Sequence, residues 1–274
     1  MNILVCIKQV PDTKIIKVNP KTNTLDRSSA PAILNPYDAH AVEEAVRLKE
    51  VHGGKVTVLS MGPPQAKAAI KKCIEIGADE GYLISDRRFA GADTLATSYA
   101  LFKAIQKMMN EQGVDLVLCG KHAIDGDTGQ TGPGIARRME IPPLTNVIKV
   151  EKVDTVANEI VVHRKIENGY ERIQSTLPCL LTVEKEINQV AYSPLPNMLR
   201  AARYNPIIWT VDDLDEVDIK QLGLKGSPTI VGKMWPPEKS KGAELIEGDV
   251  KKQATEIVAL VLSKQELFEV KGGE

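Results

Sequence analysis

The apolar run VDLVLCG at residues 114–120 is followed by a glycine-rich loop, IDGDTGQTGPGI at 124–135, and then by ARRM at 136–139. The first run is short and, apart from Asp115, apolar, as expected of a strand that is buried on both faces. ARRM has the composition of a helix that begins directly after the loop. Strand, loop and helix in this order form one step of an alternating α/β pattern, and the rest of the chain repeats that pattern.

Five apolar runs of this kind alternate with helical patterns over residues 1–185. The runs are ILVCI (3–7), KVTVLSM (55–61), GYLI (81–84), DLVLC (115–119) and CLLTVE (179–184). The helical patterns lie at about 36–51, 63–77 and 91–112, with a fourth that begins within or just after the glycine-rich loop. Such alternation predicts a doubly wound, mostly parallel sheet with helices on both faces.

A different period appears between residues 145 and 177. There NVIKVEKV, EIVVHRKI and GYERIQSTL alternate apolar with polar residues and are separated by turn residues. This alternation predicts antiparallel strands with one solvated face. We therefore expect residues 1–185 to form one α/β domain with an antiparallel edge extension at about 145–177.

The pattern changes again over residues 186–274. AYSPLPNMLRAARYNPIIW (191–209) carries three prolines and little period, and VDDLDEVDIKQLGLKG (211–226) is acidic and rich in turn residues. A terminal helix is expected near 248–262. Since these residues contain few core-forming segments, an extended arm that wraps a partner chain explains them better than a second domain does.

Composition excludes several classes of function. The net charge of −1 and the 4% aromatic content give no indication of nucleic acid or an anionic membrane as partner. No apolar run approaches the ~20 residues that span a bilayer, and we expect no stable membrane insertion. The four cysteines are far apart and form no C-x-x-C motif, which indicates small core residues in a reducing, cytoplasmic protein.

The glycine-rich loop follows a strand of the parallel sheet, where open α/β sheets bind ligands. It lacks the lysine of a Walker motif, and no G-x-G-x-x-G follows the first strand. Asp125 and Asp127 would repel an adjacent phosphate, so we expect Asp127 to cap a helix or Asp125 to accept a ribose hydroxyl. An anion would then lie at Gly129–Gly132, with Pro133 at the first position of the next helix. A structural glycine-rich turn remains the alternative.

Catalytic and metal-binding motifs are missing from the sequence. There is no G-x-S-x-G elbow and no H-E-x-x-H, and the four histidines are not spaced as metal ligands. A nucleotide-binding chain without acids, bases or nucleophiles in a recognisable arrangement indicates binding or carrying rather than bond-making.

Four stretches together resemble the β subunit of electron-transfer flavoproteins. They are ILVCIKQVPDT (3–13), NPYDAHAVEEAVRLKE (35–50), DLVLCGKHAIDGDTGQTGP (115–133), and LPCLLTVE (177–184) followed by YSPLPNMLRA (192–201). The resemblance implies an adenine-nucleotide-binding type of α/β fold and a heterodimer with a larger α subunit, whose mobile domain carries a redox FAD. It also implies a nucleotide buried in the β subunit itself.

The resemblance carries the nucleotide site onto specific positions of this chain. The residues so implied are Cys6, Lys8, Asn35, Pro36, Tyr37, Asp38, Met61, Asp125, Gly126, Asp127, Thr128, Gly129, Gln130, Thr131, Gly132, Pro133, Gly134 and Ala136. Tyr37 and Thr13 would lie toward the flavin of the α subunit. YSPLPNML resembles the recognition loop that docks onto acyl-CoA dehydrogenases, with Leu195 as the anchor beside Pro196, Asn197 and Met198.

Two types of β subunit differ in the nucleotide that they bind. The simple type holds a structural AMP, whereas the electron-bifurcating type holds a second FAD, which takes a hydride from NADH and passes electrons also to a low-potential acceptor, ferredoxin or flavodoxin. The stretch DGDTGQTGP at 125–133 resembles the bifurcating type, although Gly129 and Thr131 stand where that type usually has Ala and Val. We therefore expect FAD, with AMP as the alternative. An ATP-binding stress-type α/β module is a further alternative.

Overall fold

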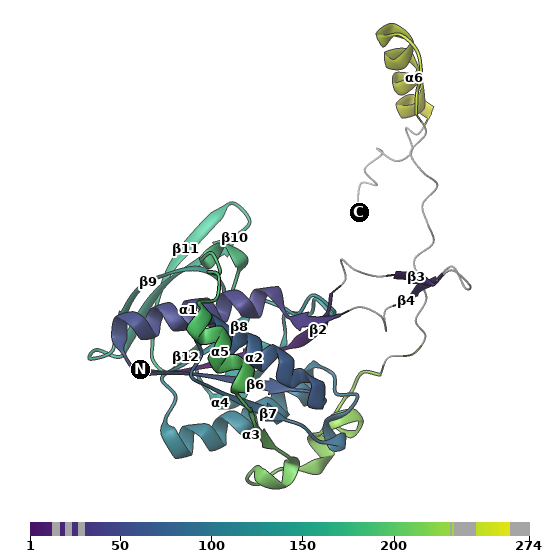
Figure 1. Cartoon of the computed structure of the whole chain (residues 1–274). Helices are drawn as coiled ribbons and strands as arrows, with labels where there is room; N and C mark the ends of the chain where they lie inside the picture. Colours follow the sequence, from purple (N-terminus) through teal and green to yellow (C-terminus); the bar gives the residue numbers. More distant parts are fainter. Residues whose placement is uncertain (13–16, 20–23, 27–30, 231, 233–244, 264–274) are drawn as a thin grey trace, which may run out of the picture. The chain divides into compact units, whose positions relative to one another are not determined.

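The apolar runs of the sequence form the strands of one large sheet. In the computed structural model, residues 1–12, 17–19, 24–26, 31–230, 232 and 245–263 are described. The strands of the sheet are β1 (Asn2–Ile7), β6 (Lys55–Met61), β7 (Glu80–Ile84), β8 (Leu116–Gly120), β9 (Pro143–Asp154), β10 (Glu159–Ile166), β11 (Gly169–Thr176), β12 (Cys179–Val183) and β13 (Ile207–Trp209). They lie in the order β11-β10-β9-β12-β8-β1-β6-β7-β13 (Figure 1).

Most of this sheet is parallel. Every neighbouring pair from β9 to β13 runs parallel, and the central strand β1 pairs with β6 on one side and with β8 on the other. Strands β10 and β11 are antiparallel and extend one edge. The predicted mostly parallel α/β sheet with an antiparallel extension is therefore confirmed.

Helices cover both faces of the sheet, as in a doubly wound fold. They are α1 (Pro36–His52), α2 (Lys67–Ile76), α3 (Thr94–Gln112), α4 (Thr131–Met139) and α5 (Leu195–Arg203). One buried apolar cluster contains side chains of α1, α2 and α5, and the other contains side chains of α3 and α4. The four cysteines are free and buried in these clusters, as predicted.

Shorter elements connect the strands and helices. They are the 3₁₀ helices η3 (Pro64–Ala66), η4 (Arg87–Phe89), η5 (Lys185–Ile187), η6 (Val211–Asp213), η7 (Ile219–Gln221) and η8 (Gly223–Lys225), and two ribbons, one of β2 (Gln9–Pro11) with β5 (Ala32–Leu34) and one of β3 (Lys17–Asn19) with β4 (Thr24–Asp26). Residues 1–232 form one compact unit and residues 233–274 a second, in which α6 (Val250–Ser263) is the expected terminal helix. The predicted domain boundary at 185 and the partner-wrapping role of the arm stay predictions.

Residues 195–209 differ from the irregular chain that the sequence analysis expects. Leu195 to Arg203 form α5, with Pro196 in the first turn, where the missing N–H of proline breaks no helical hydrogen bond. Residues 207–209 form β13, which extends the sheet beside β7. Trp209 is buried and its ring lies 4.6 Å from that of Tyr82. Residues 195–203 and 207–209 therefore form regular structure, and Ala201 and Trp209 lie in the apolar core.

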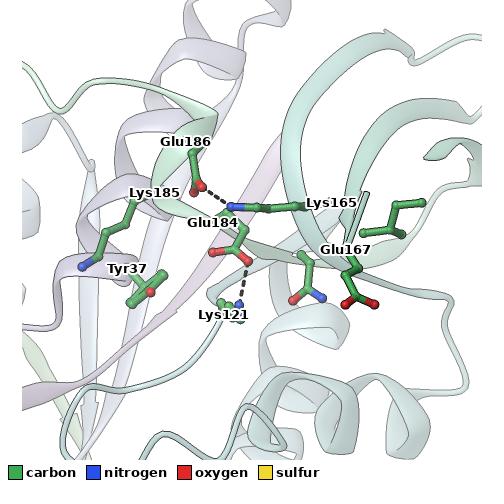
Figure 2. Close-up of a pocket in the computed structure, with 9 residues that line it drawn as sticks. Tyr37, Lys121, Lys165, Glu167, Glu184, Lys185 and Glu186 are labelled. Atoms are coloured by element: carbon green, nitrogen blue, oxygen red, sulfur yellow. Dashed lines mark hydrogen bonds and ion pairs between the residues drawn. The ribbon is translucent and has the colours of Figure 1, made fainter. Parts of the chain in front are cut away.

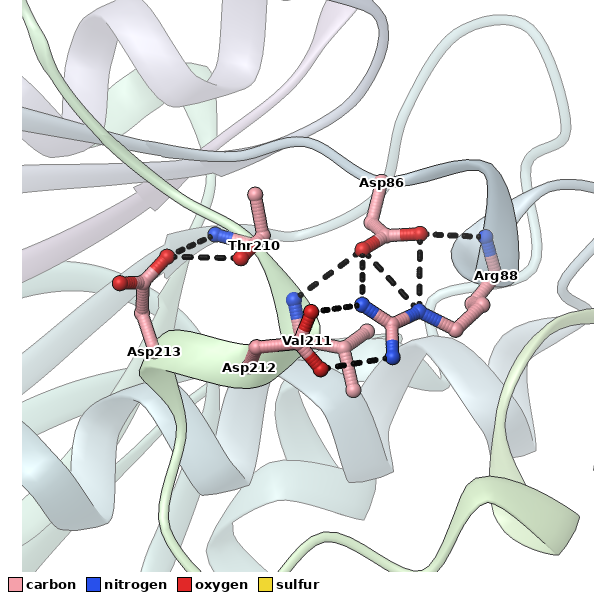
Figure 3. A network of polar contacts seen from close by, with 6 residues as sticks. All are labelled: Asp86, Arg88, Thr210, Val211, Asp212 and Asp213. Carbon is pink, nitrogen blue, oxygen red and sulfur yellow. Dashed lines mark hydrogen bonds and ion pairs between the residues drawn. The ribbon is translucent and has the colours of Figure 1, made fainter.

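A network of polar contacts fastens the chain just after β13 (Figure 3). The guanidinium of Arg88 donates to both oxygens of Asp212 at 2.8 Å and also to Asp86, which follows β7. The N–H of Val211 donates to the same Asp86 carboxylate at 3.3 Å. The Arg88 guanidinium lowers the pKa of Asp86 to about 2. Residues 86–88 thus hold residues 211–212 against the edge of the sheet.

The contribution of buried Trp209 to stability can be tested by substitution. Replacing Trp209 with Ala should lower the free energy of unfolding by about 3–5 kcal/mol, because a large buried side chain is lost and a cavity remains. Urea unfolding followed by circular dichroism measures the change. The fully exposed Tyr192 provides the control, since Tyr192→Ala should stay within about 0.5 kcal/mol. Equal, small effects of both substitutions would contradict the packing of β13 in the core.

Candidate functional site at the carboxyl edge of the sheet

The order of the strands reverses its direction between β1 and β8. From β1 the chain proceeds outward through β6 and β7, and it then crosses to the other side of β1 to form β8. Helices α1 and α3, which follow β1 and β7 in the chain, lie on opposite faces. This reversal is a topological switch point, and open α/β sheets bind ligands outside the carboxyl ends of the strands there.

Asp38 joins the two strands at this point. Its carboxylate accepts hydrogen bonds from the backbone N–H of Lys8 at 2.7 Å and from that of Gly120 at 3.2 Å, one residue after β1 and at the last residue of β8. A third donor is the side-chain amide of Asn35, at 2.9 Å. Asp38 is only 5% exposed. The buried carboxylate therefore satisfies N–H groups that would lack a partner where the strands separate.

Asn35 extends the same network into the loop that follows β8. It occupies the N-cap position of α1, as predicted, but its side chain makes no cap hydrogen bond. Its amide nitrogen donates to the carbonyl of His122 at 2.9 Å, and its amide oxygen accepts from the N–H of Ile124 at 3.3 Å. Two buried side chains at the start of α1, those of Asn35 and Asp38, thus determine where the chain after β8 leaves the sheet.

The glycine-rich loop closes on itself before α4 begins. The N–H groups of Gly126 and Asp127 both donate to the carbonyl of Ala123, and Asp127 has a left-handed φ of 50°. Asp125 pairs with Lys8 at 2.7 Å. Asp127 lies 3.4 Å from Nε2 of His122 and is four residues ahead of α4, so its predicted role as a helix cap is wrong. Asp127 belongs to the turn that closes on Ala123, and three further residues separate this turn from the first residue of α4.

The start of α4 presents free hydrogen-bond donors. The N-cap residue is Gln130, which provides no side-chain cap, and Pro133 is the third helical residue, not the first as we expected. The N–H groups of Thr131 and Gly132 donate no hydrogen bond within the described part of the chain. In contrast, the N-cap residue of α3, Asp93, accepts from two N–H groups. The first turn of α4 can therefore bind an anion.

The glycines of the loop have different surroundings. A Cβ on Gly132 would lie 2.8 Å from Cγ2 of Thr182, and one on Gly134 would lie 3.0 Å from the side chain of Ser98. Close packing of α4 on β12 and α3 therefore explains these two glycines. A Cβ on Gly126 would meet no atom within 4 Å. Packing within the chain does not require glycine at 126, and the space beside it is open.

The other predicted nucleotide residues are placed around the same edge. Cys6 is buried at the end of β1, opposite Cys119 of β8, and Met61 ends β6. Ala136 is buried in α4, whereas Thr128 and Gly129 lie in the loop. Pro36 and Tyr37 begin α1. Thr13 lies outside the described residues.

The predicted docking residues are not part of this edge. Leu195, Pro196, Asn197 and Met198 form the first turn of α5, which packs against α2. Leu195 is 67% exposed. The structure thus separates the docking residues from the residues proposed to line the nucleotide.

A cavity of about 610 Å³ opens beside the loop, at the carboxyl ends of β8 and β12 (Figure 2). Its lining residues are Tyr37, Lys121, Asn146, Lys165, Ile166, Glu167, Glu184, Lys185 and Glu186. Three lysines and three glutamates make the charge of the lining balanced. Of these nine residues, only Tyr37 was predicted as a site residue.

Ion pairs link the walls of this cavity. Lys121, which directly follows β8, lies 2.7 Å from the buried carboxylate of Glu184 after β12. Lys165 of β10 pairs with Glu186, and Glu184 also contributes to the raised pKa of Lys165. Figure 2 shows the side chain of Lys165 directed toward Glu186 and that of Lys121 directed toward Glu184. The alternating charges couple the antiparallel extension to the start of the glycine-rich loop.

Tyr37 connects the cavity with the loop. Its ring lies 4.4 Å from that of His122, edge to face, and the ammonium of Lys185 lies 4.5 Å from its centre. Lys121 and Glu184 could have been found from the sequence, because each directly follows an apolar strand. Asn146 and Lys165 carry no such signal, since they come from the alternating strands.

One family of proteins and three individual relatives resemble this chain in sequence. The electron transfer flavoprotein domain matches residues 22–214. Protein FixA of Azotobacter vinelandii is 50% identical over 248 residues, which cover 90% of this chain and 88% of FixA. The electron transfer flavoprotein subunit beta of Thermoanaerobacterium thermosaccharolyticum is 47% identical over 265 residues, which cover 96% of this chain and 99% of that subunit. The subunit of the same name from Clostridium acetobutylicum is 44% identical over 259 residues, 94% and 97% of the two chains.

Asp38 makes the stability of the fold depend on pH. Burial raises the pKa of its carboxyl group from 3.8 to about 7, against the opposing effect of the three N–H donors. Between about pH 4 and 7 the folded chain then holds one proton more than the unfolded chain, so the Asp38 contribution to stability falls as the pH rises. The difference in the free energy of unfolding between wild type and Asp38→Asn should fall by up to about 1.4 kcal/mol per pH unit.

Urea unfolding of both proteins at intervals from pH 4.5 to 7.5 measures this difference. Asp38→Asn keeps the size of the side chain but removes the titration. A difference that increases with pH would contradict the prediction and would mean that the three N–H donors outweigh burial.

Proposed function

Because this chain belongs to the electron transfer flavoprotein family as a β subunit, we propose that it binds an FAD of its own within a heterodimer with an α subunit. The FAD would accept a hydride from NADH, and the protein would bifurcate the electrons. Membership in this family favours an electron carrier over the stress-type ATP-binding module. The observation that carries the choice of FAD is the open space at Gly126 beside a helix start with free donors.

The residues at the carboxyl edge fit a nucleotide diphosphate. The N–H groups of Thr131 and Gly132 and the side chain of Gln130 are uncharged donors for phosphate oxygens, and the positive end of the α4 dipole favours an anion. Lys8 is half exposed and pairs with Asp125, and an exposed ion pair of this kind exchanges partners at little cost. Lys8 could therefore turn to a phosphate while Asp125 accepts a hydroxyl.

The chemistry would belong to the flavin, which takes two electrons as a hydride and passes them on singly, one to ferredoxin or flavodoxin and one through the FAD of the α subunit to an acyl-CoA dehydrogenase. The chain itself would bind, orient and exclude water. Asn35 and Asp38 have all their polar partners within the protein, so we assign them to holding the loop rather than to contact with the nucleotide.

The first turn of α5 is the proposed docking site for the dehydrogenase. Leu195, Met198 and Leu199 are exposed and follow the i, i+3, i+4 spacing of one helix face. An exposed apolar helix face of this kind suits insertion into an apolar pocket of a partner.

We further propose a cytoplasmic location. Among the described residues, no helix has the length and apolar character needed to cross a membrane.

Nucleotide extraction tests the proposed cofactor. The heterodimer of this chain with its α subunit should release two FAD molecules on acid denaturation, one from each subunit. Separation by liquid chromatography with absorbance at 260 and 450 nm would measure their ratio to protein. One FAD and one AMP for each heterodimer would instead support the simple type of β subunit and refute bifurcation.

Leu195→Ala tests the docking site. This substitution should reduce electron transfer with the acyl-CoA dehydrogenase about tenfold or more, since hot-spot residues contribute 1–2 kcal/mol or above, while flavin content stays unchanged. Stopped-flow reduction by the dehydrogenase measures the rate. Val156→Ala is the matched control, because Val156 is an exposed apolar residue in the turn after β9. Equal rates for all three proteins would exclude Leu195 as the anchor.

A further inference from the structure

Helix α5 has little buried surface of its own. Of its nine residues only Ala201 is buried, and a helix of this length is shorter than the ~12–15 residues that an isolated helix needs to persist in water. Apolar burial therefore contributes little to holding α5 in place. Its position depends on polar contacts with the rest of the domain, and within the described chain the side-chain contacts lie at residues 200–204.

The guanidinium of Arg200 attaches α5 to the end of α2. Its Nη2 donates to the carbonyl of Ile74 at 3.2 Å and to that of Ala78 at 2.7 Å, on either side of Gly77, the C-cap residue of α2. Carbonyl groups in the last turn of a helix lack partners within the helix and carry the negative end of its dipole. A positively charged donor at this point forms stronger hydrogen bonds than a neutral donor does.

Two more contacts attach the same end of α5. The hydroxyl of Tyr204, one residue after the helix, accepts from the backbone N–H of Gly81 in β7 at 2.6 Å. The ammonium of Lys71 in α2 donates at 3.2 Å to the carbonyl of Ala202, one of the carbonyls in the last turn of α5. The C-terminal end of α5 is therefore fixed on α2 and β7.

The N-terminal half of α5 carries the exposed apolar side chains. Leu195, Met198 and Leu199 are exposed, and the side chains of residues 195–199 make no hydrogen bond in the described part of the chain. Arg200 lies about 140° around the helix from Leu195, because successive residues of an α-helix are about 100° apart. The side chain that attaches α5 to α2 is thus separate from the side chain proposed to enter the partner.

We propose that Arg200 is a positioning residue for docking of the acyl-CoA dehydrogenase. By attaching α5 to the last turn of α2, it keeps the turn that carries Leu195 helical before the partner binds, so that less conformational entropy is lost on binding. Without this attachment α5 is helical for only part of the time, and the observed affinity falls by the same fraction. This inference rests on the proposed function, because it requires Leu195 to dock.

Arg200→Gln tests the inference in the heterodimer with the α subunit. Glutamine keeps a high helix propensity but lacks the charge and the reach of the guanidinium. With the heterodimer as the varied substrate of the acyl-CoA dehydrogenase, KM should rise about tenfold, the effect of losing hydrogen bonds from a charged group, while kcat and flavin content stay unchanged. Tyr204→Phe, which leaves every charge in place, should also raise KM.

Arg203→Gln is the matched control. Arg203 ends the same helix, and its side chain makes no hydrogen bond or ion pair among the residues that the structure describes. The substitution removes the same charge, and KM should change by less than about twofold. Hydrogen exchange of the free heterodimer gives a second measurement. The amide protons of residues 199–203 should exchange faster in Arg200→Gln than in the wild type or in Arg203→Gln, which a residue that only contacts the partner would not cause.

The outcomes separate this inference from the proposed docking site. Equal increases in KM for Arg200→Gln and Arg203→Gln would mean that charge alone matters, and would overturn the positioning role. Unchanged hydrogen exchange in Arg200→Gln would overturn it as well. In both cases a raised KM in Leu195→Ala would leave the docking site intact. A wild-type KM in Leu195→Ala would overturn the docking site, and this inference with it.

Discussion

The carboxylate of Asp38 is the constraint on which the candidate site depends. A crevice at the switch point requires β1 and β8 to separate, and separation leaves the N–H groups of Lys8 and Gly120 without their partners in the sheet. Asp38 accepts from both, at the cost of burying a charged group. Asn35 then positions the next residues through His122 and Ile124. The site therefore begins with a few hydrogen bonds that bridge the ends of two neighbouring strands.

Patterns in the sequence predict the elements whose stability comes from simple burial. The apolar runs correspond to strands, and Asn35, Pro36 and Gly53 mark the two ends of α1 as expected. Asp127 shows the limit of this reasoning. A capping residue is predicted from its type and its distance from a helix. Asp127 lies in a turn that closes on Ala123, whereas α4 begins four residues later, so the side chain of Asp127 does not cap that helix.

The same limit applies wherever distant segments meet. Trp209 was expected in irregular chain, because its burial depends on Tyr82 and the edge of β7, more than a hundred residues earlier. The cavity beside the loop combines residues of β9, β10, η5, α1 and the end of β8. No local spacing predicts such a set. Family resemblance identified the nucleotide residues, whereas the structure separates Asn35 and Asp38, which hold the loop, from the donors of α4.

The fastening of residues 211–212 by Arg88 and Asp86 also has a consequence for how the chain is made. Val211 and Asp86 are 125 residues apart in sequence, and β13 is the last strand of the sheet to leave the ribosome. Until then β7 is an edge strand with unpaired backbone groups and an uncovered Tyr82, the kind of surface through which nascent chains aggregate. The sheet is therefore complete only after residue 209 has been synthesised, and a chaperone or an early partner has its greatest effect on yield before that point.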